Sequence, residues 1–188
     1  MQRQPQRHYS VDDYFAVELN SAIKHEYYNG EIFAMAGASV AHNHITANVL
    51  GALRTALRGT TYSAFGSDLR LATPAGLFTY PNVMVIRGQI DLTPDHPDTV
   101  TNPVVLVEVL SEATRDYDRG EKFTLYQSIP ALREYLLIEQ GRLLIEHHAV
   151  GSDAVWTATW VDQLNASIDI ASIPVTLRVA DVYERVFT

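Results

Sequence analysis

Apolar residues recur along this chain with two different periods, and the change between them separates strand-like from helix-like stretches. Residues 10–19 begin with a serine and two acids, a pattern typical of a helix start. Residues 27–35 alternate around an Asn-Gly dipeptide and predict a small hairpin. Residues 39–58 carry apolar side chains at helical spacing, which predicts a long amphipathic helix.

The same patterns predict the elements of the remaining chain. They indicate strands over 62–65, 68–73 and 78–86, an exposed loop over 88–102, a helix over 119–128, a three-stranded meander over 133–139, 143–150 and 155–161, an irregular stretch over 165–174, and a closing helix over 179–186.

One stretch between these elements combines a buried strand with a charged side chain. Residues 104–110 are almost continuously apolar, as in a strand that is covered on both faces. Glu108 interrupts this run on the side of the strand that also carries Leu106 and Leu110. A buried carboxylate is costly unless a cation, a metal or hydrogen-bond donors compensate it. Glu108 is therefore either an ion-paired core residue, with an arginine as partner, or a metal ligand.

The composition narrows the classes of protein that fit. The chain has 188 residues, of which 47% are hydrophobic, so we expect one domain over 1–188 with a loose arm over 1–9. It has no cysteine, no apolar run long enough to span a membrane and no secretory signal at its start, which favours a cytoplasmic protein. The net charge of −8 argues against non-specific binding to phosphate backbones.

Only two lysines are present, and one of them follows the interrupted strand. Lys122 lies at the edge of the apolar stripe of the predicted 119–128 helix. From there its ammonium can reach back over the end of the strand that carries Glu108. The alternative is a surface lysine that extends into solvent and pairs with Asp118 four residues earlier.

A third polar position precedes a neighbouring strand. Asn82 follows a proline and leads the apolar run 83–86, which places its side chain at a sheet edge. Two acidic-type positions with a lysine nearby suit phosphodiester hydrolysis, in which a divalent ion polarises the phosphoryl oxygen and a cation attends the nucleophile. Such triples are common, so spacing alone does not specify this chemistry. His44, one residue from the apolar stripe of its helix, is a further candidate to face a cleft.

The segments YPNVMVI and NPVVLVEVLSEATRDYDRGEKFTLYQSIPALREYLLI resemble the Uma2 (DUF820) family of nucleases, which have the PD-(D/E)xK restriction-endonuclease-like fold. The resemblance implies an α/β (α+β) domain with a mixed central sheet flanked by helices, to which the pattern of the chain adds a C-terminal β-meander. It places the first acid of the motif at Asn82, the second at Glu108 and a displaced lysine at Lys122. The carbonyl of Val109 would be a further metal ligand.

The sequence departs from the family motif at Asn82, where the family has aspartate. An amide brings no charge and binds Mg²⁺ poorly, so we expect Mg²⁺ (or Mn²⁺) to be weakly held unless Asp68 compensates. The resulting hypothesis is a Mg²⁺-dependent endonuclease for DNA, impaired at residue 82. The alternatives are a catalytically silent dimeric binding or scaffold module and a metal-dependent hydrolase of small phosphorylated molecules. The apolar surface of the meander predicts a homodimer.

Overall fold

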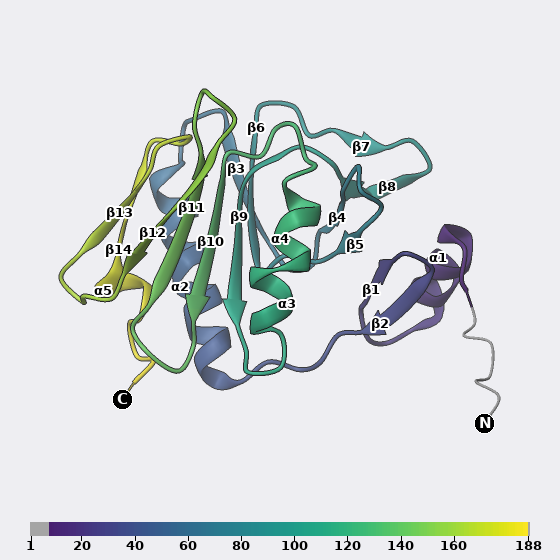
Figure 1. Cartoon of the computed structure of the whole chain (residues 1–188), viewed down its shortest axis with the longest axis horizontal. Coiled ribbons are helices and arrows are strands. Elements are labelled where there is room, and N and C mark those ends of the chain that lie inside the picture. The colour runs from purple at the N-terminus through teal and green to yellow at the C-terminus, as the bar shows by residue number, and fades with distance from the viewer. Residues whose placement is uncertain (1–7, 188) are drawn as a thin grey trace.

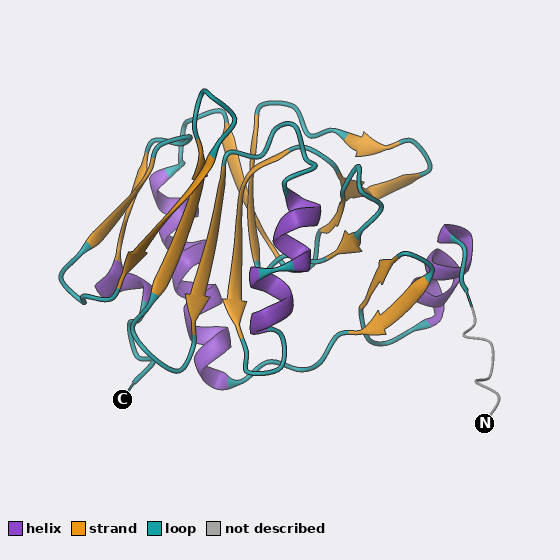
Figure 2. Cartoon of the chain, in the orientation of Figure 1, coloured by secondary structure: helices purple, strands orange, loops and turns teal. Residues whose placement is uncertain are grey.

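The structure, a computed structural model that describes residues 8–187, is a mixed α+β fold with two six-stranded mixed sheets and a two-stranded sheet (Figures 1 and 2). Its helices are α1 (Val11–Asn20), α2 (Val40–Ala56), α3 (Arg115–Arg119), α4 (Glu121–Tyr126) and α5 (Val179–Val182). Its strands are β1 (His25–Tyr28), β2 (Glu31–Ala34), β3 (Tyr62–Gly66), β4 (Arg70–Ala72), β5 (Phe78–Thr79), β6 (Val83–Arg87), β7 (Leu92–Thr93), β8 (His96–Val100), β9 (Pro103–Leu110), β10 (Glu134–Glu139), β11 (Ile145–Val150), β12 (Trp156–Val161), β13 (Ser167–Ile170) and β14 (Val175–Arg178).

The central sheet has the strand order β12-β11-β10-β9-β6-β3. Strands β9 and β10 are parallel, and every other neighbouring pair in this sheet is antiparallel. Strand β9 lies inside the sheet, and nearly all of its side chains are buried. The continuous apolar run therefore marks a strand covered on both faces, as the sequence predicts.

The two faces of β9 contribute to two separate cores. Val105, Val107 and Val109 pack on the face covered by α2, β13, β14 and α5. Leu106 and Leu110 pack on the opposite face, against residues of α4. Glu108 shares this second face by the alternation of the strand. Figure 1 shows α3 and α4 in front of β9, with α2 behind the sheet.

The second sheet has the order β2-β1-β5-β4-β8-β7 and joins the N-terminal segment to the rest of the fold. Helix α1 begins at a capping box, in which Ser10 and Asp13 each hold a backbone N–H of the other. Tyr14, Phe15 and Tyr27 form a buried aromatic cluster that packs α1 on the hairpin. Tyr27 also pairs with Phe78 across β1 and β5, so the hairpin is fixed to the second sheet.

The structure differs from the sequence prediction in four places. The predicted strand 78–86 is two strands, β5 and β6, which enter different sheets on either side of Tyr80, Pro81 and Asn82. The predicted loop 88–102 contains β7 and β8, because Thr99 and Val100 are buried against β4. The third difference lies at the C-terminal end of the chain, where the predicted irregular stretch 165–174 contains β13, and α5 begins at the predicted residue 179 but ends at Val182.

The fourth difference concerns the helix that carries Lys122. The predicted helix 119–128 is divided into α3 and α4 at Gly120, where the backbone leaves helical geometry. A Cβ atom at Gly120 would stand 3.1 Å from the carbonyl oxygen of Asp116, so a larger residue would crowd this junction. The break places the side chain of Lys122 over the strand β9.

Two expectations concern the ends and the surface of the chain. The predicted arm over residues 1–9 lies mostly outside the described residues, although Tyr9 donates its backbone N–H to the carbonyl of Gly30 at 2.8 Å. Among the described helices, none is long and apolar enough to cross a membrane.

Candidate active site

The site begins where β6 starts beside β9. Val83, the first residue of β6, pairs with Val107, so Asn82 lies next to Glu108 and Val109 at the end of the paired region. The backbone N–H of Asn82 donates to Glu108 Oε2 at 3.2 Å. The backbone N–H of Val109 donates to Asn82 Oδ1 at 2.7 Å. The structure thus brings together all three residues that were predicted as metal ligands.

The hydrogen bond from Val109 also determines what the Asn82 amide can offer to a ligand. Because Oδ1 accepts this bond, the other branch of the amide is Nδ2, which is a donor. An aspartate here would accept the same N–H with one oxygen and keep a second oxygen for a cation. Asn82 therefore keeps the hydrogen bond that an aspartate would accept, and it offers a cation only one neutral oxygen that already has a partner.

The carboxylate of Glu108 is buried at the face of β9 that α4 covers, with 4% of the residue exposed. Its Oε1 accepts a hydrogen bond from the hydroxyl of Tyr126 at 2.8 Å and pairs with Lys122 Nζ at 2.9 Å. Burial raises the pKa of Glu108 to about 7, against the opposing charge of the Lys122 ammonium. Among the described residues, no arginine pairs with Glu108, so the expectation of an arginine partner is wrong.

The ammonium of Lys122 is the centre of a buried ion-pair cluster. Its Nζ lies 2.9 Å from Glu108 Oε1, 2.9 Å from Glu26 Oε1 and 3.4 Å from Asp118 Oδ1. Burial alone would lower the pKa of Lys122, but the negative groups around it raise the pKa well above its ordinary value. The lysine is 5% exposed, so the alternative of a surface lysine extending into solvent is wrong, although its predicted pairing with Asp118 is present.

Two acids of this cluster were not singled out by the sequence as site residues. Asp118 was considered only as a surface partner of Lys122, yet it is 4% exposed. Glu26 belongs to the short strand β1, whose alternation does not distinguish it from a solvent-facing acid. The sequence does show that one face of the hairpin is polar. It does not show which part of the fold that face contacts.

A histidine also lies at the edge of the site, though not the predicted one. Burial lowers the pKa of His42, whereas a hydrogen bond with the backbone of Val109 and the charge of Asp118 oppose this shift. His42 thus contacts the residue whose carbonyl was predicted as a ligand, and it is positioned by the first turn of α2, which Ser39 caps. No such contact joins His44 to these residues in the described structure.

Asp68, the proposed compensating carboxylate, does not join the cluster. It lies in the turn between β3 and β4 and pairs with Lys24. Its side chain is 97% exposed, whereas Glu108 and Lys122 are buried. A missing ligand at residue 82 is therefore not replaced by Asp68.

The chemistry of the donors determines whether a divalent cation fits. The site presents oxygen atoms of carboxylate, amide and backbone, which are the ligands that Mg²⁺ prefers. Three carboxylates and one ammonium carry a formal charge of −2 when all are ionised, and one divalent cation would balance this charge. Within residues 8–187, no three His, Asp or Glu side chains form a metal-binding group by themselves. The oxygen donors of Glu108, the Val109 carbonyl and the Asn82 amide would suit a divalent cation, and with one carboxylate among the three they would hold it weakly.

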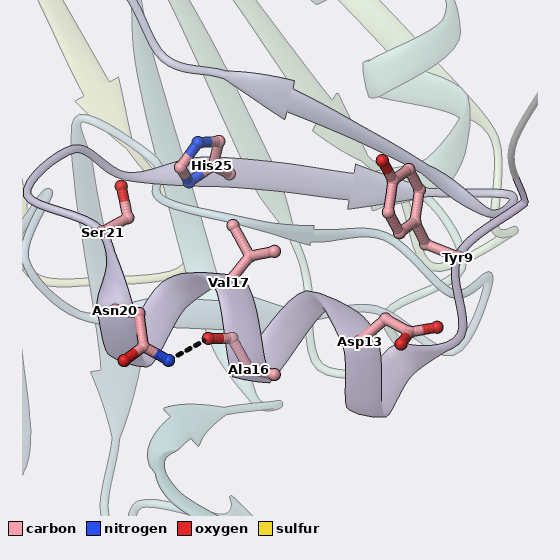
Figure 3. Close-up of a pocket in the computed structure, with 7 residues that line it drawn as sticks. All are labelled: Tyr9, Asp13, Ala16, Val17, Asn20, Ser21 and His25. Atoms are coloured by element: carbon pink, nitrogen blue, oxygen red, sulfur yellow. Dashed lines mark hydrogen bonds between the residues drawn. The ribbon is translucent and has the colours of Figure 1, made fainter.

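A separate shallow hollow of about 530 Å³ lies beside α1 and the hairpin (Figure 3). It is lined by Tyr9, Asp13, Ala16, Val17, Asn20, Ser21 and His25. Its ionisable groups have structural partners: Asp13 completes the helix cap, and His25 Nδ1 lies 2.8 Å from Glu18 Oε1. None of the predicted site residues lines it.

The central sheet has one parallel pair of strands between antiparallel neighbours, with the Glu108 carboxylate and the Lys122 ammonium over one face, and this fold has a counterpart of known structure. A crystal structure described as a "putative nuclease belonging to DUF820" from Anabaena variabilis superposes on this chain with a TM-score of 0.73. The likeness covers 92% of this chain and 96% of the other at 15% sequence identity, so it establishes the fold.

The sequence comparisons identify the family. The family model Uma2, described as "Putative restriction endonuclease", matches residues 11–180. Two uncharacterized proteins of Synechocystis sp. strain PCC 6803 are similar: sll1609 is 36% identical over 85% of this chain and 90% of its own length, and slr1290 is 31% identical over 93% and 90%. The chain belongs to the Uma2 family, as its sequence motifs predict.

Proposed function

We propose that this protein is a divalent-metal-dependent endonuclease that hydrolyses DNA phosphodiester bonds slowly, because Asn82 occupies the position of a metal-binding aspartate. The observation that carries the proposal is the meeting of residue 82, Glu108 and Lys122 at one end of the β6–β9 pair. The family and fold support nuclease chemistry, and the substrate and cofactor are inferred from them.

Each residue of the site has a role that follows from its contacts. Glu108, the carbonyl of Val109 and Asn82 would hold Mg²⁺ or Mn²⁺, which when bound supplies charge stabilisation and an acidified water. Tyr126 orients the Glu108 carboxylate through its hydroxyl. The ammonium of Lys122 is charged and held over the strand end, where it can donate hydrogen bonds to a phosphate oxygen or to the attacking water.

The reduced rate follows from the chemistry of residue 82. The amide offers one neutral oxygen, which already accepts the Val109 N–H, in place of a second carboxylate oxygen. Fewer negative ligands lower the affinity for a hard divalent cation. The site therefore needs a high metal concentration to act.

The second candidate function is a catalytically silent binding or scaffold module of the same fold. It is favoured by the Lys122 ammonium, because three carboxylates already form ion pairs with it. The acidic net charge of −8 also favours it over a nucleic-acid enzyme. Hydrolysis of small phosphorylated molecules is the third candidate, for which an acidic surface is no obstacle.

The assembly we propose is a cytoplasmic homodimer formed through the C-terminal meander. Strand β12 is an edge strand of the central sheet, since it pairs only with β11 among the described strands. Trp160 on this strand is 63% exposed, and Leu164 after it is 52% exposed. An edge strand with large exposed apolar side chains is suited to pack against the same strand of a second copy.

The decisive experiment compares the native chain with Asn82→Asp on supercoiled plasmid, single-stranded DNA and a small phosphodiester, with Mg²⁺ or Mn²⁺. We expect Asn82→Asp to raise the DNA cleavage rate on the order of 100-fold, because it supplies the missing carboxylate. Asn165→Asp, which adds the same charge in an exposed loop, is the matched control and should change nothing.

The site assignment is tested in the Asn82→Asp background. Glu108→Gln and Lys122→Ala should each abolish the gained cleavage. If the Asn82→Asp variant neither cleaves nor binds DNA at low salt, the nuclease proposal fails and the scaffold module takes its place. Cleavage of the small phosphodiester alone would favour the third candidate.

A further inference from the structure

The carboxylate of Glu26 reaches the site from outside the central sheet. Glu26 lies on β1, in the N-terminal hairpin, and its Oε1 is 2.9 Å from the Nζ of Lys122, 96 residues later in the chain. The side chain of Glu26 is 12% exposed. In Figure 1 the hairpin stands to one side of the central sheet, so this contact joins two parts of the fold at the site.

The position of Glu26 is fixed by the residues on either side of it. Tyr27 turns into the aromatic cluster of α1 and pairs with Phe78 of β5, so Glu26 faces the opposite side of β1. The hydroxyl of Thr79, which is fully buried, donates a hydrogen bond to Glu26 Oε1. One oxygen of Glu26 is thus held by β5 and by Lys122 together.

Lys122 needs a second carboxylate close to its ammonium, because the oxygens of Glu108 have other partners. Its two oxygens already accept hydrogen bonds from Tyr126 and from the backbone of Asn82. A cation bound to Glu108 would compete with Lys122 for the same oxygen. Asp118 lies farther from the ammonium, at 3.4 Å, so Glu26 is the partner best able to retain it.

We propose that Glu26 is a positioning residue of the active site, which holds the charged Lys122 ammonium over the end of β9 while Glu108 serves the cation and the substrate. The proposal rests on the proposed function for its catalytic consequence. It makes the α1–β1–β2 segment part of the active site, although the motif residues all lie in or beside the central sheet and on α4.

The first test measures Lys122 directly, without any catalysis. The chain has only two lysines, so selective ¹⁵N-lysine labelling gives two side-chain signals, and Lys24→Arg assigns them. We expect Lys122 in Glu26→Gln to lose its proton at a lower pH than in the native chain. Glu121→Gln is the matched control, because it removes an exposed acid next to Lys122 and should leave the signal unchanged.

The second test measures cleavage in the Asn82→Asp background. Glu26→Gln keeps an acceptor for Thr79 but removes the charge, and we expect it to lower the rate roughly tenfold, the scale of one charge-assisted hydrogen bond. The alkaline limb of the pH–rate profile should move to lower pH. Glu26→Asp, which keeps the charge on a shorter side chain, should recover part of the rate.

The outcomes separate this proposal from the proposed function. If Lys122 titrates in Glu26→Gln and in Glu26→Asp as it does in the native chain, Glu26 is not a positioning residue and the inference is overturned. If the Lys122 signal shifts but Asn82→Asp shows no cleavage, Glu26 still positions the lysine and the hydrolytic function fails. A variant that does not fold is replaced by Thr79→Val, which frees the Glu26 carboxylate and should give a smaller shift in the same direction.

Discussion

Two charged clusters at the C-terminal ends of neighbouring strands have opposite composition. The lysine cluster consists of Lys122 with Glu26, Glu108 and Asp118. The arginine cluster consists of Glu139 with Arg115, Arg119 and Arg142. In the first, one cation is surrounded by three acids, and in the second, Glu139 is surrounded by three arginines, of which Arg119 also pairs with Glu146. The strands β9 and β10 that carry Glu108 and Glu139 are direct neighbours.

The clusters differ in where their excess charge lies. In the arginine cluster the buried Glu139 is balanced by guanidinium groups that reach solvent, with Arg142 66% and Arg115 41% exposed. In the lysine cluster the central ammonium and the carboxylates of Glu108 and Asp118 are all buried. Excess charge is cheap where water screens it and costly where it does not. A buried excess of negative charge therefore distinguishes the lysine cluster from the arginine cluster, and it supports the cation site that we propose.

The largest expected effect is the loss of stability on removing the central charge of the lysine cluster. Lys122→Met leaves three neighbouring acids without a cation, and we expect it to lower the free energy of unfolding by about 3–5 kcal/mol at pH 8. Arg115→Met should cost about 1 kcal/mol, because Arg115 is 41% exposed and Glu139 keeps Arg119 and Arg142. Urea unfolding of both variants measures the difference, and equal losses would remove the distinction between the clusters.

A change of pH sharpens the same comparison. At pH 5 the carboxyl of Glu108, whose pKa burial raises to about 7, takes up a proton, so the loss caused by Lys122→Met should shrink. The loss caused by Arg115→Met should change less, because solvent already screens this arginine. A Lys122→Met variant that is equally destabilised at both pH values would contradict a buried excess of negative charge.

The part of the site that the sequence predicted lies within a short stretch of chain. Glu108 stands out because an ionisable residue interrupts an apolar strand, and Lys122 because it borders a packed helical stripe. Both signals are local, since a strand and the following helix pack on each other whatever surrounds them. The family motif then added Asn82, which β-pairing with β9 places beside Glu108.

The part that the sequence did not predict depends on contacts between distant elements. Glu26 becomes a site residue only because β1 pairs with β5 and Glu26 reaches Lys122 of α4, and neither contact has a local pattern. The strand β8 was missed for a similar reason. Its sequence HPDTV has turn-like composition, and its pairing with β4 and β7 makes it a strand.

The next effect in size is the pH dependence of stability that arises from Glu108. Its pKa is raised to about 7 in the folded protein, above the ordinary value of 4.5. The favourable contribution of its protonated form is complete below pH 4.5 and is lost as the pH rises through 7. Relative to Glu108→Gln, the native chain should therefore lose up to about 3 kcal/mol of unfolding free energy between about pH 4.5 and 8.

This comparison is measured by urea unfolding of the native chain and Glu108→Gln across that pH range. Glu139→Gln is the control from the arginine cluster, where solvent-exposed guanidinium groups surround the acid. A difference between native chain and Glu108→Gln that stays flat from pH 5 to 8 would show that Glu108 is ionised throughout. The lysine cluster would then hold its full negative charge at every pH tested.

The smallest effect concerns the hydroxyl of Tyr126, which can be compared with that of Tyr135. Tyr126 donates to the Glu108 carboxylate at 2.8 Å, whereas Tyr135 donates to the backbone carbonyl of Asp118 at 3.1 Å, and both rings are buried. A hydrogen bond to a charged group stabilises more than one to a neutral carbonyl. We expect Tyr126→Phe to cost about 1.5–2 kcal/mol at pH 8 and Tyr135→Phe about 1 kcal/mol.

Because the Tyr126 hydroxyl lowers the pKa of Glu108, its removal should also move the pH-dependent loss of stability to higher pH, and Tyr135→Phe should leave that midpoint in place. Equal midpoints in the two variants would mean that Tyr126 contributes to packing and not to the ionisation of the site.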